Sequence, residues 1–179
     1  RDAFKAKLVA EEQVSTTLGI AEKTMTLASL HNILPENIFI DAFGVGHSIA
    51  QEIALASNER IRAVNVGEKA NEERFLNLRA VSYWRLKEWL ARGGKLTRHP
   101  LWTQFKSIHF KRLLSGRIMI MSKEDMMKNG WTSPDATDAL MLTFLPEQTG
   151  KLESFPKGTY SHQSLPDEDI AERIMSYGK

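Results

Sequence analysis

The sequence predicts an α/β fold with parallel strands. Short runs of β-branched residues alternate with segments that have the apolar spacing of helices, and the connections between them are brief. The 179 residues, of which 42% are hydrophobic and 26% charged, suffice for one ordinary domain with a buried core. No cysteine is present, which excludes disulfides and thiolate metal sites, and no apolar run approaches the length of a membrane span.

The first half of the chain contains predicted strands and helices in alternation. In order, they are a strand over residues 4–14, a helix over residues 15–34, a strand over residues 37–41, a helix over residues 48–57 and a strand over residues 61–66. Pro35 ends the first helix because it cannot continue the ladder of backbone hydrogen bonds. Gly44 and Gly46 close the second strand and permit close approach of the backbone behind it.

The second half is predicted to contain further helices and one further strand. Ser122 is a predicted N-cap, and Gly130 closes the short helix that follows it. In order, the predicted elements are a helix over residues 71–92, a strand over residues 116–122, a helix over residues 122–130 and a last helix after residue 133. The predicted domain covers residues 1–146, and a polar tail over residues 147–179 contains one small helix over residues 167–177.

Basic residues are concentrated between positions 79 and 128. This segment holds twelve Lys or Arg against three acids, a net charge of +9, with six aromatic residues interleaved. The pattern is typical of a nucleic-acid surface, and equally of amphipathic elements with solvated basic faces. The DNA-binding candidates are Arg79, Arg85, Lys106, Lys111, Arg112, Arg117 and Lys123.

Two carboxylates stand three positions apart in the segment SPDATDALMLTF, residues 133–144. Ser133 fits the N-cap and Pro134 the first helical position, so a structural role at the positive end of the helix is sufficient for Asp135. Asp138 shares a face with Asp135, and the residues after it are apolar nearly all round the helix. Like charges beside a buried region repel and lose hydration unless a cation compensates them. Oxygen ligands suit magnesium or manganese, so both acids are candidate metal ligands.

Asp41 is a third candidate acid. It stands at the C-terminal end of the strand predicted over residues 37–41, where open α/β sheets place their ligands. A turn-forming or helix-capping role is the alternative for a lone acid at such a position. With Asp135 and Asp138, it predicts a cluster in which carboxylates from separate elements hold two metals about 4 Å apart for phosphodiester hydrolysis.

Three segments of the sequence carry a family resemblance. They are IFIDAFGVGHSIAQEI at residues 38–53, VNVGEKANEERFLNLRAVSYWRLKEWL at residues 64–90 and GRIMIMSKEDMMKNGWTSPDATDALMLTF at residues 116–144. In this order and spacing they resemble the C-terminal nuclease domain of the large terminase subunit of tailed phages, over about residues 1–146. The D-x-x-D helix also resembles the last helix of Holliday-junction resolvases, which share the ribonuclease H-like fold.

The resemblance implies a ribonuclease H-like mixed sheet flanked by helices, and an endonuclease that cuts concatemeric viral DNA for packaging. Asp41 matches the second acidic ligand, and Asp135 and Asp138 match the acidic pair of the final motif; together they imply two Mg²⁺ or Mn²⁺ ions. The implied partners are double-stranded DNA, the portal, the small terminase subunit and the packaging ATPase domain of the same full-length chain. The implied location is the cytoplasm of the infected bacterial host, transiently at the procapsid portal. A catalytically silent DNA-binding or motor-docking module is the alternative.

The sequence departs from the family pattern in three places. The family's domain begins with a strand that carries the first metal-binding Asp, and this chain is expected to start after that strand. No G-x-x-x-x-G-K-[ST] phosphate loop is present, so the ATPase is not part of this chain. Val81 stands where family members often have an acid, so Arg79 is expected to lack a partner. We therefore expect the 179 residues alone to cleave DNA weakly or not at all.

Overall fold

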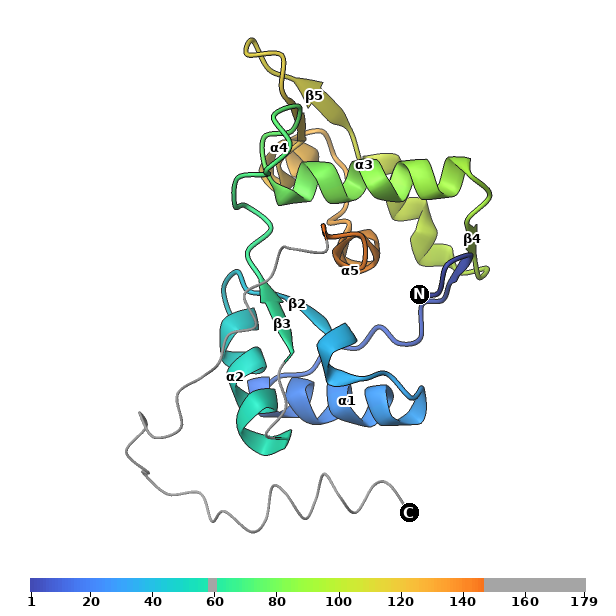
Figure 1. Ribbon diagram of the computed structural model, residues 1–179, viewed down its shortest axis with the longest axis vertical. Coiled ribbons are helices and arrows are strands. Elements are labelled where there is room, and N and C mark those ends of the chain that lie inside the picture. The colour runs from blue at the N-terminus through green and yellow to red at the C-terminus, as the bar shows by residue number, and fades with distance from the viewer. Residues whose placement is uncertain (58–60, 147–179) are drawn as a thin grey trace. The chain divides into compact units, whose positions relative to one another are not determined.

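The computed structural model describes residues 1–57 and 61–146 as two compact units (Figure 1). Of these residues, unit 1 comprises residues 1–12 and 65–146, and unit 2 comprises residues 13–57 and 61–64. Unit 1 is therefore built from two separate stretches of chain. The mixture of helices and small sheets agrees with the predicted α/β class. The predicted polar tail and its small helix lie outside the described residues.

In the described residues of unit 2, a pair of parallel strands is accompanied by two α-helices. The elements are α1 (Thr17–Leu30), the 3₁₀ turn η1 (Pro35–Asn37), β2 (Phe39–Asp41), α2 (Gly46–Ser57) and β3 (Arg62–Val64). β2 and β3 are hydrogen-bonded in parallel, with Ile40 opposite Ala63. Their connection runs through α2, because parallel neighbours cannot be joined by a tight turn. The prediction of parallel strands joined by a helix is confirmed here.

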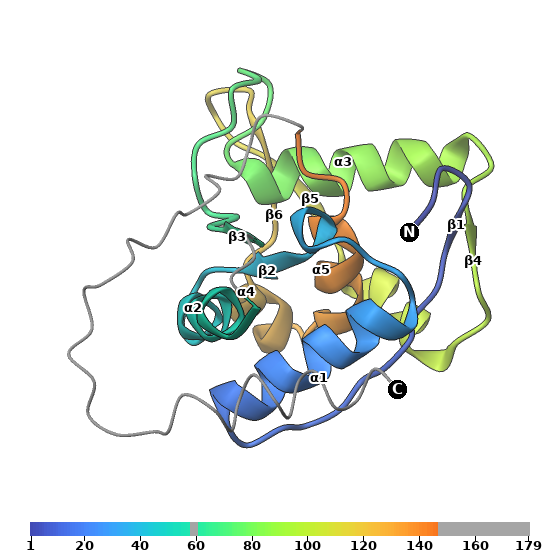
Figure 2. The same cartoon turned by 60° about the horizontal axis from the view of Figure 1, so that its bottom comes forward.

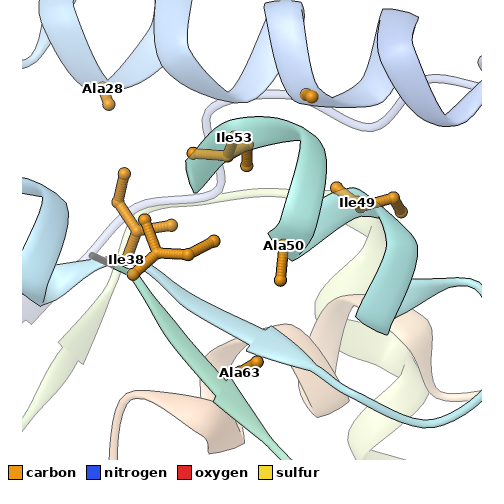
Figure 3. Close-up of a cluster of buried hydrophobic side chains, with 8 residues drawn as sticks. Ala28, Ile38, Ile49, Ala50, Ile53 and Ala63 are labelled. Atoms are coloured by element: carbon orange, nitrogen blue, oxygen red, sulfur yellow. The ribbon is translucent and has the colours of Figure 1, made fainter. Parts of the chain in front are cut away.

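Small and β-branched side chains form the core of unit 2 (Figure 3). Ile49 and Ile53 lie one turn apart on α2, and Ile53 is completely buried. Ala21 and Ala28 are buried in the same cluster, and their small size permits close packing of α1 on α2. Burial of an isoleucine side chain contributes about 2 kcal/mol. This core holds β2, and therefore the backbone of Asp41, in a defined position within unit 2.

Unit 1 is organised around helix α3 and carries two small sheets in its described part. The elements are β1 (Lys5–Ala6), α3 (Leu78–Ala91), β4 (Lys95–Leu96), the 3₁₀ segment η2 (Pro100–Ser107), β5 (Phe110–Arg112), β6 (Ile118–Ile120), α4 (Lys123–Lys128) and α5 (Asp135–Leu142). β1 pairs with β4 in parallel, and β5 and β6 form an antiparallel hairpin. The indole of Trp89 donates to the carbonyl of Ala3 at 2.8 Å, which ties the first stretch of unit 1 to the second.

Helix α3 packs against both β6 and α5 (Figure 2). Leu78 and Leu86 are 2% and 1% exposed, so the helix buries apolar side chains against its neighbours. The segment before α3 lies along β6, where the backbone N–H of Ile118 donates to the carbonyl of Arg74 at 2.8 Å and that of Leu76 donates to the carbonyl of Ile118 at 2.9 Å. These contacts fix the start of α3 relative to the hairpin.

Several elements are shorter than predicted. The strand predicted over residues 4–14 consists of Lys5–Ala6, because only these residues find a partner, in β4. The first helix ends at Leu30, since Asn32 takes a left-handed conformation (φ 52°) before Pro35 is reached. The strands predicted over residues 37–41, 61–66 and 116–122 keep three residues each.

The start of α3 also differs from the prediction. The predicted helix begins at residue 71, whereas α3 begins at Leu78. Asn77 ends the preceding segment because its side-chain oxygen accepts from the N–H of Ala80 at 3.0 Å and so caps the helix. The predicted cap of α4 is confirmed, since the hydroxyl of Ser122 accepts from the N–H of Asp125 at 3.1 Å.

Candidate functional site

The two acids of the D-x-x-D motif lie on the first turn of α5. The predicted cap at Ser133 is wrong, because its hydroxyl donates to Asp135 Oδ1 at 2.7 Å and Pro134 occupies the N-cap position. The first turn is capped instead by the side-chain oxygen of Gln104, which accepts from the N–H of Ala136 at 2.9 Å. A residue of η2 therefore helps to set where α5 begins and where its acids stand.

Asp138 is held on both carboxylate oxygens. Its Oδ1 accepts from the hydroxyl of Tyr83 at 2.7 Å and from Arg79 Nη2 at 3.0 Å, while Lys123 Nζ lies 3.3 Å from its Oδ2. The side chains of Arg79 and Asp138 are 14% and 18% exposed. Because water reaches this pair only partly, the contact between the charges is stronger than a surface ion pair.

Lys123 connects the two acids. Its Nζ lies 3.1 Å from Asp135 Oδ1, in addition to its contact with Asp138. Burial lowers the pKa of Lys123, but the charge of Asp138 and the contacts with Asp135 outweigh it, so the pKa is raised. Burial raises the pKa of Asp135, but the hydrogen bonds from Ser133 and Lys123 and the lysine charge outweigh it, so this pKa is lowered. Two carboxylates thus share one ammonium group at neutral pH.

Arg79 has a partner, contrary to the expectation from the sequence. Its Nη2 and Nε donate to Asp138 Oδ1 at 3.0 and 3.3 Å, and its Nη1 donates to the carbonyl of Met121 at 3.2 Å. Family members often have an acid at the position of Val81. In this chain the partner of Arg79 is instead Asp138 of α5. With Lys123, Arg79 brings the local charge of the two acids to zero.

Tyr83 contacts Asp138 but was not among the site residues predicted from the sequence. It is 2% exposed, and its hydroxyl lies 3.2 Å from the hydroxyl of Thr137 as well as contacting Asp138. Burial raises the pKa of Tyr83, and the negative charge of Asp138 raises it further. The sequence could have indicated this role, because Tyr83 stands four residues after Arg79 and therefore on the same face of the helix.

Replacing Tyr83 by phenylalanine is expected to make the free energy of unfolding less dependent on pH in the alkaline range. Because its pKa in the folded chain is raised above the ordinary 10.0, the stability that depends on the neutral phenol is fully present below pH 10 and is lost as the pH rises above it. At neutral pH the variant should be less stable by about 1.5–3 kcal/mol, because a hydrogen bond to a charged group is lost. Urea unfolding of both proteins across the alkaline range measures this, and equal alkaline dependence would contradict it.

Asp41 lies at the exposed end of β2 in unit 2. Its Oδ1 accepts from the N–H of Phe43 at 3.1 Å, and the backbone then turns through Gly44 with φ 65°. A Cβ on Gly46 would lie 1.8 Å from the carbonyl oxygen of Asp41. The prediction that glycines permit close backbone approach behind this acid is therefore confirmed for Gly46, whereas a Cβ on Gly44 would meet no atom within 4 Å.

The candidate acids are distributed over both units. Asp135 and Asp138 lie together in unit 1, and Asp41 belongs to unit 2. Within residues 1–57 and 61–146, no three His, Cys, Asp or Glu side chains form a group that could hold a metal ion. In unit 1 the two acids of α5 are bridged by the ammonium group of Lys123.

The basic candidates divide into two groups. Four contact acids of unit 1: Arg79 and Lys123 as described, Arg85 with Glu72 at 2.9 Å, and Lys111 with Asp125 at 2.7 Å. The others, Lys106, Arg112 and Arg117, form no ion pair within the described residues. A high density of basic residues in the sequence therefore overstates the positive charge that this unit offers to a polyanion.

In the part of the chain that the structure describes, no helix has both the length and the apolar character needed to cross a membrane. Comparison of the sequence with models of protein families and with curated proteins finds no match.

Proposed function

We propose that the chain is a metal-dependent DNA endonuclease with a ribonuclease H-like fold, the nuclease part of a viral genome-packaging terminase. It would cut concatemeric DNA in the cytoplasm of an infected bacterial host, with the portal, the small terminase subunit and an ATPase domain as partners. The observation that carries the proposal is the arrangement of Asp135 and Asp138 around a single cation, the ammonium of Lys123.

The two acids of α5 offer oxygen ligands of the kind that a divalent ion prefers. Lys123 Nζ lies within 3.3 Å of one oxygen of each acid, so a cation in that place meets two carboxylates. Magnesium and manganese prefer oxygen ligands, and carboxylates are their usual protein ligands. Asp135 and Asp138 would hold the metal, and Asp41 is proposed as a further ligand. When bound, two such ions supply an activated water and stabilisation of the leaving oxygen.

The neighbouring side chains orient the acids. Tyr83 and Arg79 both contact Asp138 Oδ1, so the carboxylate cannot rotate freely and its Oδ2 is directed towards Lys123. Fixed orientation lowers the entropic cost of binding a cation or a substrate phosphate. Lys123 is the mobile partner in this proposal, because a long side chain can leave the acids and contact a phosphate oxygen instead.

One observation favours the alternative, a catalytically silent DNA-binding or motor-docking module. The negative charges of Asp135 and Asp138 are already balanced by Lys123 and Arg79. A site whose charges are internally compensated needs no metal for stability. The alternative predicts DNA binding without cleavage under any metal condition.

Nicking of supercoiled plasmid DNA distinguishes the two functions. The protein is prepared with the expected upstream strand and its Asp restored, and is assayed in millimolar magnesium or manganese. Nicking is expected to be metal-dependent, and Asp138→Asn and Asp41→Asn should each abolish it while DNA binding survives.

Asp125→Asn is the matched control. Asp125 is also an acid of unit 1, but it pairs with Lys111 and does not contact Asp135 or Asp138. This variant should nick at the wild-type rate. Undiminished nicking by both Asp138→Asn and Asp41→Asn would contradict the metal site, and DNA binding without nicking by the restored protein would favour the silent module.

A further inference from the structure

The β5–β6 hairpin ends in a short turn at one end of unit 1 (Figure 1). The strands pair with Arg112 opposite Ile118. The turn is closed by hydrogen bonds from the N–H of Leu113 to the carbonyl of Arg117 and from the N–H of Gly116 to the carbonyl of Leu113, both 2.9 Å. The tip is therefore a defined turn on a two-stranded ribbon.

Leu114 occupies the tip with its side chain fully in water. Its relative exposure is 111%, the highest of the exposed large hydrophobic residues in the described part of the chain. A single exposed leucine is common and needs no explanation by itself. Leu114 differs from such a residue because two arginines, Arg112 and Arg117, flank it in the sequence of the hairpin.

Cations lie on both faces of the hairpin. Successive residues of a strand point to opposite faces, so Arg112 shares a face with Phe110, while Lys111 lies on the other. Arg112 is opposite Ile118, and Arg117, one residue before Ile118, therefore lies on the face of Lys111. In the described residues neither Arg112 nor Arg117 forms an ion pair, whereas Lys111 is paired with Asp125.

Positive charge continues from the hairpin onto α3. The ring of Trp84 lies 5.3 Å from that of Phe110 in β5. Arg74 Cζ and Lys87 Nζ lie over the Trp84 ring, at 4.1 and 4.3 Å from its centroid. The face of the hairpin that carries Arg112 thus adjoins two further cations held on an aromatic side chain, a combination typical of nucleic-acid surfaces.

We infer that the β5–β6 hairpin enters the minor groove of duplex DNA, with Leu114 against the base edges and Arg112 and Arg117 on the phosphates of opposite strands. Two-stranded ribbons and apolar wedges are established means of entering DNA grooves, and the wedge partly unstacks a base step. The partner is duplex DNA because its two phosphate rows flank a groove, which suits cations on two opposite faces of one ribbon. The inference rests on the proposed function for its substrate.

Fluorescence anisotropy tests the role of the two arginines. It measures binding of the full chain to a fluorescein-labelled duplex, in EDTA and over a series of salt concentrations. Arg112→Ala/Arg117→Ala should weaken binding and reduce the log–log salt slope by about 2, because each phosphate contact contributes about 0.9. Arg92→Ala is the control, since this arginine is 80% exposed at the end of α3, and it should leave the slope unchanged. A wild-type slope in the double variant would overturn the inference, as would equal affinity of the wild type for single-stranded DNA.

A duplex containing 2-aminopurine tests Leu114. Unstacking of the base step should increase its fluorescence when the wild-type chain binds, and Leu114→Ala should lose this increase while retaining the salt slope. Leu55→Ala, which removes another exposed leucine in unit 2, should behave as the wild type. An unchanged signal in Leu114→Ala would overturn the wedge.

These measurements are separable from the proposed nuclease. EDTA prevents metal-dependent cleavage, so binding is measured without it. Loss of the hairpin effects with metal-dependent nicking intact would overturn this inference alone. Absence of nicking by the restored protein, with the hairpin effects intact, would overturn the nuclease and support the DNA contact.

Discussion

Replacing Gly46 by alanine is expected to destabilise unit 2 by about 3 kcal/mol or more, because the added methyl group cannot be accommodated. The new Cβ would lie 1.8 Å from the carbonyl oxygen and 2.9 Å from the carbonyl carbon of Asp41. Both atoms belong to backbone at the end of β2, so relief requires movement of the strand or of α2 rather than of a side chain. Urea unfolding of the full chain measures the loss.

Gly44→Ala separates a steric clash from backbone strain. Gly44 has φ 65°, but a Cβ there would meet no atom within 4 Å. Its replacement should therefore cost only the strain of a left-handed alanine, about 1–2 kcal/mol. Equal losses for Gly44→Ala and Gly46→Ala would contradict the clash.

In the restored nuclease, Gly46→Ala should also impair nicking, because Asp41 moves with the backbone that the methyl group displaces.

Replacing Arg79 by methionine is expected to destabilise the chain by about 3 kcal/mol. The substitution keeps most of the side-chain volume but leaves Asp138, which is 18% exposed, without its guanidinium partner. Removal of one partner of a mostly buried ion pair is costly because the remaining charge stays poorly hydrated. Lysine should not restore full stability, since it cannot contact both Asp138 and the carbonyl of Met121 in the same geometry.

A double-mutant cycle assigns this loss to the pair. Arg79→Met combined with Asp138→Asn should destabilise less than the sum of the single changes, with a coupling of about 2 kcal/mol. Arg85→Met is the control, because the pair of Arg85 with Glu72 is 40% and 46% exposed and should contribute less than about 1 kcal/mol. An Arg79→Met loss no larger than that of the control would contradict the buried contact.

The sequence predicted features that depend on local spacing. Asp135 and Asp138 share a helical face because they are three residues apart, and Ser122 caps α4 because hydroxyl side chains suit that position. The parallel pairing of β2 and β3 followed from a helix between two short apolar runs. In each case the deciding interaction lies within one element or between consecutive elements.

Features that depend on distant partners were not predicted. Arg79 was expected to be unpaired, yet it contacts an acid 59 residues later because α3 and α5 pack together. The cap of α5 comes from Gln104, and no pattern near position 133 indicates it. The alternation of apolar and polar residues could not reveal the length of β1 either, because a strand extends only as far as its partner does.

The discontinuity of unit 1 has a consequence for how the protein folds. Lys5 and Ala6 of β1 pair with residues 95 and 96 of β4, and the indole of Trp89 donates to the carbonyl of Ala3, 86 positions earlier. The described residues of unit 2, 13–57 and 61–64, lie in this interval, so the β1–β4 contact closes a very long loop. Loop closure loses more chain entropy as the loop lengthens, but a folded insert shortens the effective loop. Unit 2, with its local β2–α2–β3 contacts, should therefore form early, and docking of the first residues onto unit 1 should be a late and slow step.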